Sequence, residues 1–207
     1  MSITPAELAA TVAVALGIPT NSVKNYDRKL MEAGLRTKKG HGRGSAIMGA
    51  EDAAVLLAAI SSCDEIGRAP DCVRKLYRTP YAGVTGNNPK SEFAELAVLC
   101  EIVGATENDV DTFGKALVAI LRHLVSKPDP KHYFSFEVSI ACGAPYAVDL
   151  IIAMPKKIKR IEFYRAGDAA KTIAGGLRVK REVMGSALVW VAEIIAGRAP
   201  ASTEEIA

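Results

Sequence analysis

Residues 34–48, GLRTKKGHGRGSAIM, combine basic side chains with glycines, and these are the residue types that bind anionic ligands. The basic residues are Arg36, Lys38, Lys39, His41 and Arg43, and glycines stand at positions 34, 40, 42 and 44. Three structures fit such a segment: a solvated loop, a phosphate-binding loop, or the wing of a protein that reads nucleic acid. The neighbouring residues decide between them.

A phosphate-binding loop does not fit this spacing. The P-loop pattern has four residues between an earlier glycine and Gly-Lys-Ser/Thr. The run from Gly40 to Ser45 reads GHGRGS, which has neither that spacing nor the lysine. The dinucleotide-binding pattern G-x-G-x-x-G after a buried strand is also absent. A wing fits better, with Arg43 or His41 entering a narrow minor groove and Lys38 and Lys39 contacting flanking phosphates. A flexible basic loop without groove contacts stays the alternative.

Two helices are predicted before this segment. Thr4, Pro5 and Glu7 form a helix start, with Thr4 as cap, Pro5 in the first turn and Glu7 closing a capping box. Gly17 is expected to end that helix. After the Ile18-Pro19 turn, Thr20 or Ser22 is expected to cap a second helix over residues 20–33 that ends at Gly34. Two short helices joined by a tight turn indicate a helix-turn-helix.

In that motif the second helix enters the major groove, and the residues near its N-terminus lie closest to the bases. Asn21 and Asn25 lie four residues apart on one face and can each read adenine. Arg28 can read guanine or hold a phosphate, and Lys24 and Lys29 are expected on phosphates. A merely solvated polar helix face is the alternative. The predicted DNA-binding residues are Thr20, Asn21, Ser22, Lys24, Asn25, Arg28, Lys29, Arg36, Lys38, Lys39, His41 and Arg43.

Residues 4–62 resemble the winged helix-turn-helix of MerR-like and prophage-type bacterial regulators. The matching features are Val23 with Tyr26, Gly34-Leu35, Arg43 in the basic wing, and Glu51-Asp52 before the next helix. The resemblance implies a bacterial or prophage DNA-binding regulator. A MerR regulator continues into a long coiled-coil helix, which this sequence lacks, so no metal or drug effector is assigned.

The second half has a different pattern. Helices are expected at residues 91–103 and 107–125, strands at 134–140, 146–152, 158–164 and 177–183, and a final helix at 185–196. The predicted fold class is α+β: an N-terminal winged helix-turn-helix plus a C-terminal helix pair with a small antiparallel sheet. The predicted divisions are a DNA-binding domain at 1–62, a linker with a short helix at 63–90, and a dimerisation, partner or effector domain at 91–207.

Composition limits the other function classes. The formal net charge of +3 is mild, but nine Lys/Arg face three acids in residues 154–183, which indicates solvated strand faces, a second nucleic-acid surface or a site for an acidic partner. The four cysteines are widely spaced and predict reduced thiols and no zinc site. Glu137 and Asp149 could form a carboxylate pair on adjacent strands, although solvated carboxylates are the simpler expectation. We predict no catalytic residues, no metal, no cofactor, no signal peptide and no membrane span.

The leading functional hypothesis is a sequence-specific transcription regulator that binds double-stranded DNA as a homodimer in the cytoplasm, at the nucleoid. The strands and the helix at 186–196 are expected to supply the dimer interface. A second hypothesis is a phage-type adaptor or inhibitor that uses the winged helix and residues 91–207 to bind a protein. An enzyme with a DNA-binding appendage is the third.

Overall fold

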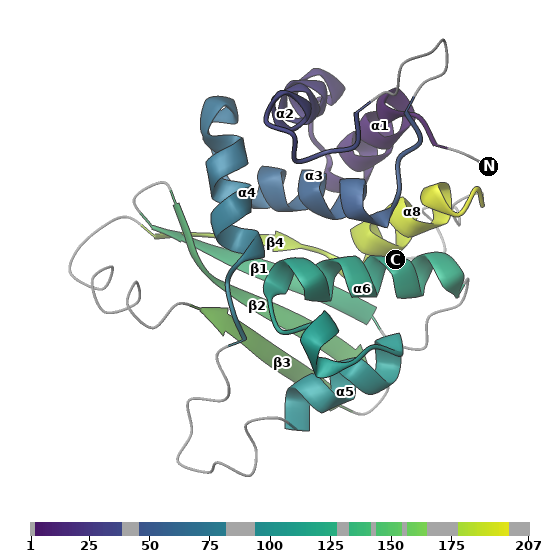
Figure 1. Ribbon diagram of the computed structural model, residues 1–207, viewed down its shortest axis with the longest axis vertical. Coiled ribbons are helices and arrows are strands. Elements are labelled where there is room, and N and C mark those ends of the chain that lie inside the picture. The colour runs from purple at the N-terminus through teal and green to yellow at the C-terminus, as the bar shows by residue number, and fades with distance from the viewer. Residues whose placement is uncertain are drawn as a thin grey trace.

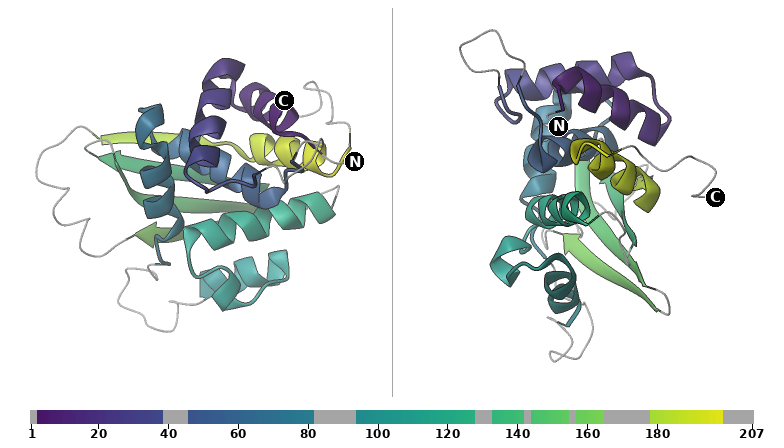
Figure 2. Two further views of the ribbon diagram at one scale, coloured as in Figure 1. Left: turned by 45° about the horizontal axis from the view of Figure 1, so that its top comes forward. Right: turned by 90° about the vertical axis from the view of Figure 1, so that its right-hand side faces the viewer.

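The computed structural model describes residues 3–38, 46–81, 94–127, 133–141, 144–154, 157–164 and 178–198. These residues form a mixed α+β fold, in which helices pack on a four-stranded antiparallel sheet (Figure 1). One face of the sheet is covered by helices, and no described helix lies on the other face (Figure 2). The α+β class predicted from the sequence is therefore confirmed.

Helix α1 spans Pro5–Leu16 and starts as predicted. The Thr4 hydroxyl accepts a hydrogen bond from the Glu7 amide at 3.3 Å, and the Glu7 carboxylate accepts one from the Thr4 amide at 2.7 Å. These hydrogen bonds from Thr4, first from its backbone, lower the pKa of Glu7. Gly17 ends the helix in the left-handed conformation (φ +64°), which glycine adopts without strain.

Helix α2 spans Thr20–Glu32, but its start differs from the prediction. Pro19 occupies the capping position, Thr20 is the first helical residue, and neither Thr20 nor Ser22 caps the helix with its side chain. Instead the Pro19 carbonyl accepts hydrogen bonds from the amides of Ser22 and Val23. Proline suits a position where no backbone donor is needed, so the turn itself starts the helix.

Helix α3, Ala50–Ser62, is the central helix of the molecule. It is rich in alanine and aliphatic residues and buried on nearly every side. It contacts α2, helix α4 (Ala69–Tyr77), helix α6 (Phe113–Ser126) and the sheet. A helix that is apolar all round belongs inside a core.

The segment after α3 was predicted as a linker with a short helix at 63–90, and a short helix forms there, packed into the core. A short 3-10 helix, η1 (Ile66–Arg68), leads into α4, which buries Ala69, Cys72, Val73 and Leu76. Pro80 and Tyr81 then pair with Thr112 and Phe163 through isolated bridges. Residues 63–81 are thus part of the core, and residues 82–90 of the predicted linker lie outside the described residues.

The predicted helix pair forms, with a shorter second helix. Helix α5 spans Ala94–Val103, and a 3-10 turn, η3 (Glu107–Asp109), precedes α6. The Asp109 carboxylate accepts hydrogen bonds from the Thr106 amide and hydroxyl, which cap the start of η3. Apolar residues that recur at helical spacing in α5 and α6 are all buried: Leu96, Leu99, Leu117, Ile120, Leu121 and Leu124.

The sheet has the strand order β3-β2-β1-β4, and all neighbours are antiparallel. The strands are β1 (Tyr133–Ala141), β2 (Ala144–Met154), β3 (Lys157–Tyr164) and β4 (Arg178–Val183). The predicted alternation is confirmed, since the inward side chains of β1 and β2 are buried beneath the helices: Phe134, Phe136, Val138, Ile140, Val148, Leu150 and Ile152. Phe113 of α6 meets Phe136 edge-on at 5.2 Å between ring centroids.

Helix α8, Gly185–Ile195, packs against α1, α6 and β1. Its apolar residues Ala187, Leu188, Val191 and Ala192 are buried inside the chain, so they do not provide the dimer interface expected from this helix. One continuous hydrophobic core includes residues from α1 through α8. Residues of both predicted divisions, 1–62 and 91–207, contribute to this core.

Candidate nucleic-acid interface

Helix α2 presents one polar face to solvent at the top of the molecule (Figure 1). Asn21, Lys24, Asn25 and Arg28 are exposed, and their spacing of three and four residues places them on one face. The opposite face, with Val23, Tyr26 and Leu30, is buried. The structure therefore brings together four of the side chains predicted to contact DNA.

The remaining α2 residues predicted to contact DNA are partly buried or ion-paired. Thr20, Ser22 and Lys29 are half-buried. The Lys29 ammonium lies 2.8 Å from the Glu32 carboxylate, and Arg28 lies 3.9 Å from the same group. Within the described residues Lys24 makes no ion pair. These surface pairs are weak, about 0.3–0.5 kcal/mol, so Arg28 can exchange Glu32 for another anion.

Arg36 is a correction among the predicted DNA-binding residues. Its side chain is only 6% exposed, and its guanidinium donates to both carboxylate oxygens of Asp27, itself 11% exposed. A further hydrogen bond of 2.7 Å reaches the Thr37 carbonyl. Arg36 thus holds the segment after α2 against the helix, and its cation is not available to a phosphate.

Asp52 of α3 fixes both ends of the basic segment. One carboxylate oxygen accepts the Thr37 amide at 2.8 Å, and the other accepts the Gly49 amide at 3.0 Å. Met48 is held separately, because its amide donates to the Ile3 carbonyl at 2.9 Å. The chain therefore leaves α2 and returns to α3 at fixed positions, as the base of a wing requires.

The basic segment, residues 34–48, is only partly described. Lys38 is exposed, whereas Lys39, His41 and Arg43 lie outside the described residues. In the described parts of this segment, 34–38 and 46–48, the β-bridge observed joins Met48 to Ile3.

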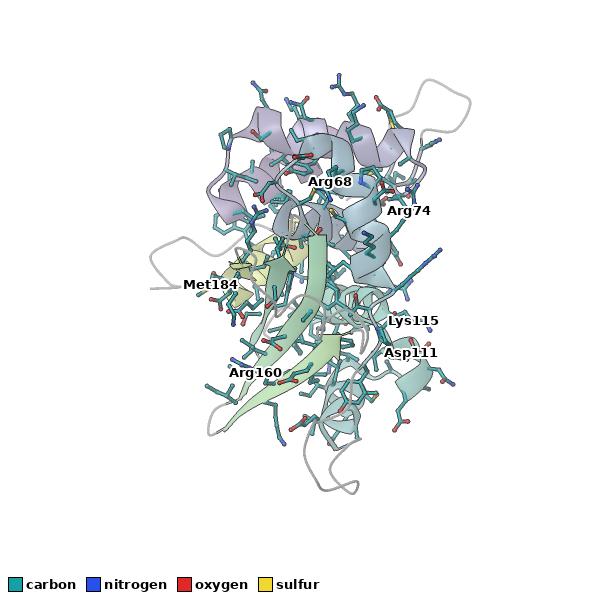
Figure 3. All side chains as sticks on the ribbon, turned by 90° about the vertical axis from the view of Figure 1, so that its left-hand side faces the viewer. Arg68, Arg74, Asp111, Lys115, Arg160 and Met184 are labelled. Atoms are coloured by element: carbon teal, nitrogen blue, oxygen red, sulfur yellow. The ribbon has the colours of Figure 1, made fainter. Side chains whose placement is uncertain are left out.

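Helix α4 adds basic residues beside α2 that the sequence analysis missed. Arg68, just before it, and Arg74, Lys75 and Arg78 are exposed. Arg74 donates to the Ala33 carbonyl at the end of α2 at 3.4 Å. Figure 3 labels Arg68, in the 3-10 turn before α4, and Arg74, on α4. The amphipathic run DCVRKLYR was the available signal, since its charged positions recur at helical spacing.

Among the basic residues of the range 154–183, Arg181 and Lys180 of β4 point to opposite faces of the sheet. Arg181 of β4 faces inward and donates to the carbonyls of Ile60 and Cys63 at 3.1 and 3.0 Å, where it also pairs with Asp64. The Tyr26 hydroxyl donates to the same Cys63 carbonyl at 2.8 Å. Arg181 therefore ties β4 to the end of α3 and to α2. Lys180 faces outward and pairs with Glu137 at 2.5 Å.

Four carboxylates form one row across the open face of the sheet. The register places Glu182 opposite Glu137, Glu137 opposite Asp149, and Asp149 opposite Glu162. Burial raises the pKa of Asp149 and the Glu137 charge adds to it, although Arg160 at 3.9 Å acts in the opposite direction. The predicted Glu137–Asp149 pair is therefore a true cross-strand neighbour pair.

We expect Asp149→Asn to stabilise the protein at pH 7 by about 0.2–1 kcal/mol, because it removes a like-charge neighbour from the row. The folded-state pKa of Asp149 lies above its unfolded value, so the folded state binds the proton more tightly. As the pH falls through the folded-state pKa of Asp149, the free energy of unfolding of the wild type therefore rises relative to that of the variant. The difference in stability between the two proteins should shrink by pH 4. Urea unfolding at both pH values measures this. Arg160→Gln should act in the opposite direction at pH 7.

Other chemistry receives little support from the described residues. Among them, no group of three or more His, Cys, Asp or Glu side chains is placed to hold a metal ion. Cys63 and Cys72 are buried, and burial with the neighbouring Cys63 thiol raises the pKa of Cys72 to about 12, so it stays a thiol at neutral pH. His123 is buried with its ring edge-on to Phe134.

Comparisons with protein-family models, with curated proteins and with solved structures find no match for this chain. Within the described ranges, no helix is both long enough and apolar enough to cross a membrane. The functional argument therefore depends on the chemistry of the chain itself.

Proposed function

We propose that this protein is a sequence-specific DNA-binding regulator of the winged helix-turn-helix type. The carrying observation is the exposed face of α2, where Asn21, Lys24, Asn25 and Arg28 stand together directly after a tight turn. Asn and Arg form paired hydrogen bonds with base edges in the major groove, whereas Lys positions the protein on phosphates.

The support for a wing is the anchoring of the basic segment. Arg36 and Asp52 hold its two ends beside α2 and α3. A segment fixed in this way next to a recognition helix can reach the adjacent minor groove or backbone. Lys38, Lys39, His41 and Arg43 are the proposed contacts there. We propose binding as a homodimer, because one helix reads only a few base pairs and two copies reach successive turns of the major groove.

The first test measures the binding of a DNA duplex to wild type, Lys24→Ala and Arg28→Ala. Fluorescence anisotropy across a salt series gives each affinity and its salt dependence. Each substitution should weaken binding by about 1–3 kcal/mol and lower the salt slope by about 1, because each removes one cation from the DNA. Arg160→Ala is the matched control, because Arg160 lies on the sheet away from α2 (Figure 3). Equal affinities for all four proteins would remove α2 from the interface.

Sequence specificity needs a separate measurement. Footprinting on the DNA around the protein's own gene, with wild type and Arg43→Ala side by side, should show a protected site that weakens or shortens in the variant. Binding no tighter than to random-sequence DNA at moderate salt would contradict sequence-specific recognition. An unchanged footprint with Arg43→Ala would refute the wing contact alone.

A further inference from the structure

A large groove lies on the face of the molecule that carries α4 and α6. Its volume is about 1130 Å³. It is lined by Val73, Arg74 and Tyr77 of α4, by Arg78 directly after that helix, by residues of α6 and by Val55 of α3. Gly34 and Leu35, after α2, and residues 103–105, at the end of α5, also line it. Figure 3 shows Arg74 and Lys115 on the same side of the molecule.

The lining combines apolar surface with cations. Its apolar residues are Leu35, Val55, Val73, Val103, Ala105, Val118 and Ala119. Its charged residues are the four cations Arg74, Arg78, Lys115 and Arg122 and one acid, Asp109. The Asp109 carboxylate is already engaged, because it accepts hydrogen bonds from the Thr106 amide and hydroxyl at 3.0 and 2.6 Å.

The acids that pair with three of these cations do not line the groove. Arg74 lies 3.0 Å from Asp71 and Lys115 lies 2.9 Å from Asp111, while Arg122 pairs with Glu51. All three pairs are at the surface, with both partners between 44% and 76% exposed. Such pairs contribute at most about 1 kcal/mol each, so a bound anion can compete for their cations. The side chains that line the groove are therefore four cations against one carboxylate, and a bound anion would replace the weakly held acids at their exposed pairs.

Tyr77 adds an unused donor beside this lining. Its hydroxyl is buried and has no hydrogen-bond partner among the described residues. Burial raises the pKa of Tyr77 strongly, and the nearby charges of Glu51 and Asp52 raise it further, so it stays protonated. A buried donor without an acceptor is uncommon in folded proteins and costs about 1–3 kcal/mol.

We propose that this groove binds a small organic anion with an apolar body. The apolar side chains would hold the body, and Arg78 with Arg122 would hold the anionic group. Sites for organic ligands have this character, with mostly apolar lining, few placed polar groups and volumes of about 300–1,000 Å³. The ligand would also contact Gly34 and Leu35 at the end of α2. The binding claim does not depend on the proposed DNA interaction.

The test uses two dyes with the same aromatic body. 8-Anilinonaphthalene-1-sulfonate carries an anionic group, and N-phenyl-1-naphthylamine has none. The full chain should bind the sulfonate at one saturable site, several-fold more tightly than the neutral dye. Arg78→Gln should weaken binding of the sulfonate by roughly fivefold or more and leave binding of the neutral dye unchanged. Arg160→Gln, on the sheet, should change neither.

A second variant tests the location. Val118→Trp places an indole in the groove and should abolish binding of both dyes, with circular dichroism to verify that the variant is folded. If it does not fold, the combined variant Arg78→Gln, Arg122→Gln tests the location through the anionic group. Both side chains are exposed, and the variant should weaken binding of the sulfonate more than Arg78→Gln does, without changing binding of the neutral dye. Sulfonate binding that is absent, unsaturable or indifferent to these substitutions would overturn the proposal. A change in oligomeric state in Val118→Trp, measured by light scattering, would also overturn the proposal. The groove would then be a contact between two copies of the chain.

Discussion

Asp27→Ala is expected to lower the free energy of unfolding by about 3–5 kcal/mol, which is among the largest effects of any single substitution described here. The substitution leaves the Arg36 guanidinium in a site where only 6% of its side chain is exposed, without the carboxylate that neutralises it. The cost comes from the unpaired buried cation more than from the lost attraction. Urea unfolding at neutral pH measures the change.

Two controls separate this explanation from general damage to α2. Asp71→Ala breaks an exposed ion pair with Arg74, whose side chains are 76% and 44% exposed, and should cost less than about 1 kcal/mol. The double variant Asp27→Leu, Arg36→Met removes both buried charges and keeps apolar volume, so it should recover most of the stability. If the double variant is no more stable than Asp27→Ala, burial of an unpaired charge is not the cause.

The pair between Asp27 and Arg36 also shows which signal in the sequence argued against a DNA contact for Arg36. In a linear sequence Arg36 is one of five basic residues in a glycine-rich segment. The contrary signal was on α2, where Asp27 falls in the buried stripe formed by Val23, Tyr26 and Leu30. An acid in an apolar stripe requires a cation, and Arg36 is the basic residue that reaches it.

The strands in the second half of the chain were predicted correctly because the pattern that specifies them lies within each strand. Period-two alternation in β1 and β2 specifies which face of each strand is buried, and a one-residue shift would reverse it. Phe134, Phe136 and Val138 therefore identified the inward face without knowledge of the tertiary structure. The same holds for the start of α1, where Thr4 and Glu7 lie only three residues apart.

Long-range packing was not predictable in the same way. The run from residue 63 to residue 90 has the glycines and prolines of a linker, yet α4 within it packs against α3, α2 and the sheet. The groove depends on α4 and α6, which are separated by 35 residues between Tyr77 and Phe113. No local period specifies such a pairing, so neither the single core nor the groove could be derived from the sequence pattern.

Gly114→Ala is the second substitution with a large expected effect, and its direction opposes ordinary helix propensity. At an unconstrained helical position glycine to alanine stabilises by about 1 kcal/mol. In the first turn of α6, however, an added Cβ would lie 2.3 Å from Cδ1 and 2.5 Å from Cγ of the Tyr77 ring. The ring must move within a packed interface, and such overpacking costs about 1–3 kcal/mol. Thermal and urea unfolding should both show the loss.

Two further variants assign this loss to the Tyr77 ring. Gly67→Ala has no atom within 4 Å of its new Cβ and an ordinary backbone conformation, so it should be neutral or slightly stabilising. Adding Gly114→Ala to a Tyr77→Ala background should cost much less, because the two ring atoms are gone and only the Cβ of residue 77, at 2.9 Å, remains near the added Cβ. The coupling between positions 77 and 114 should then be at least about 1 kcal/mol. Additive effects of the two substitutions would show that the ring does not limit position 114, and that α4 and α6 are packed less closely than the structure places them.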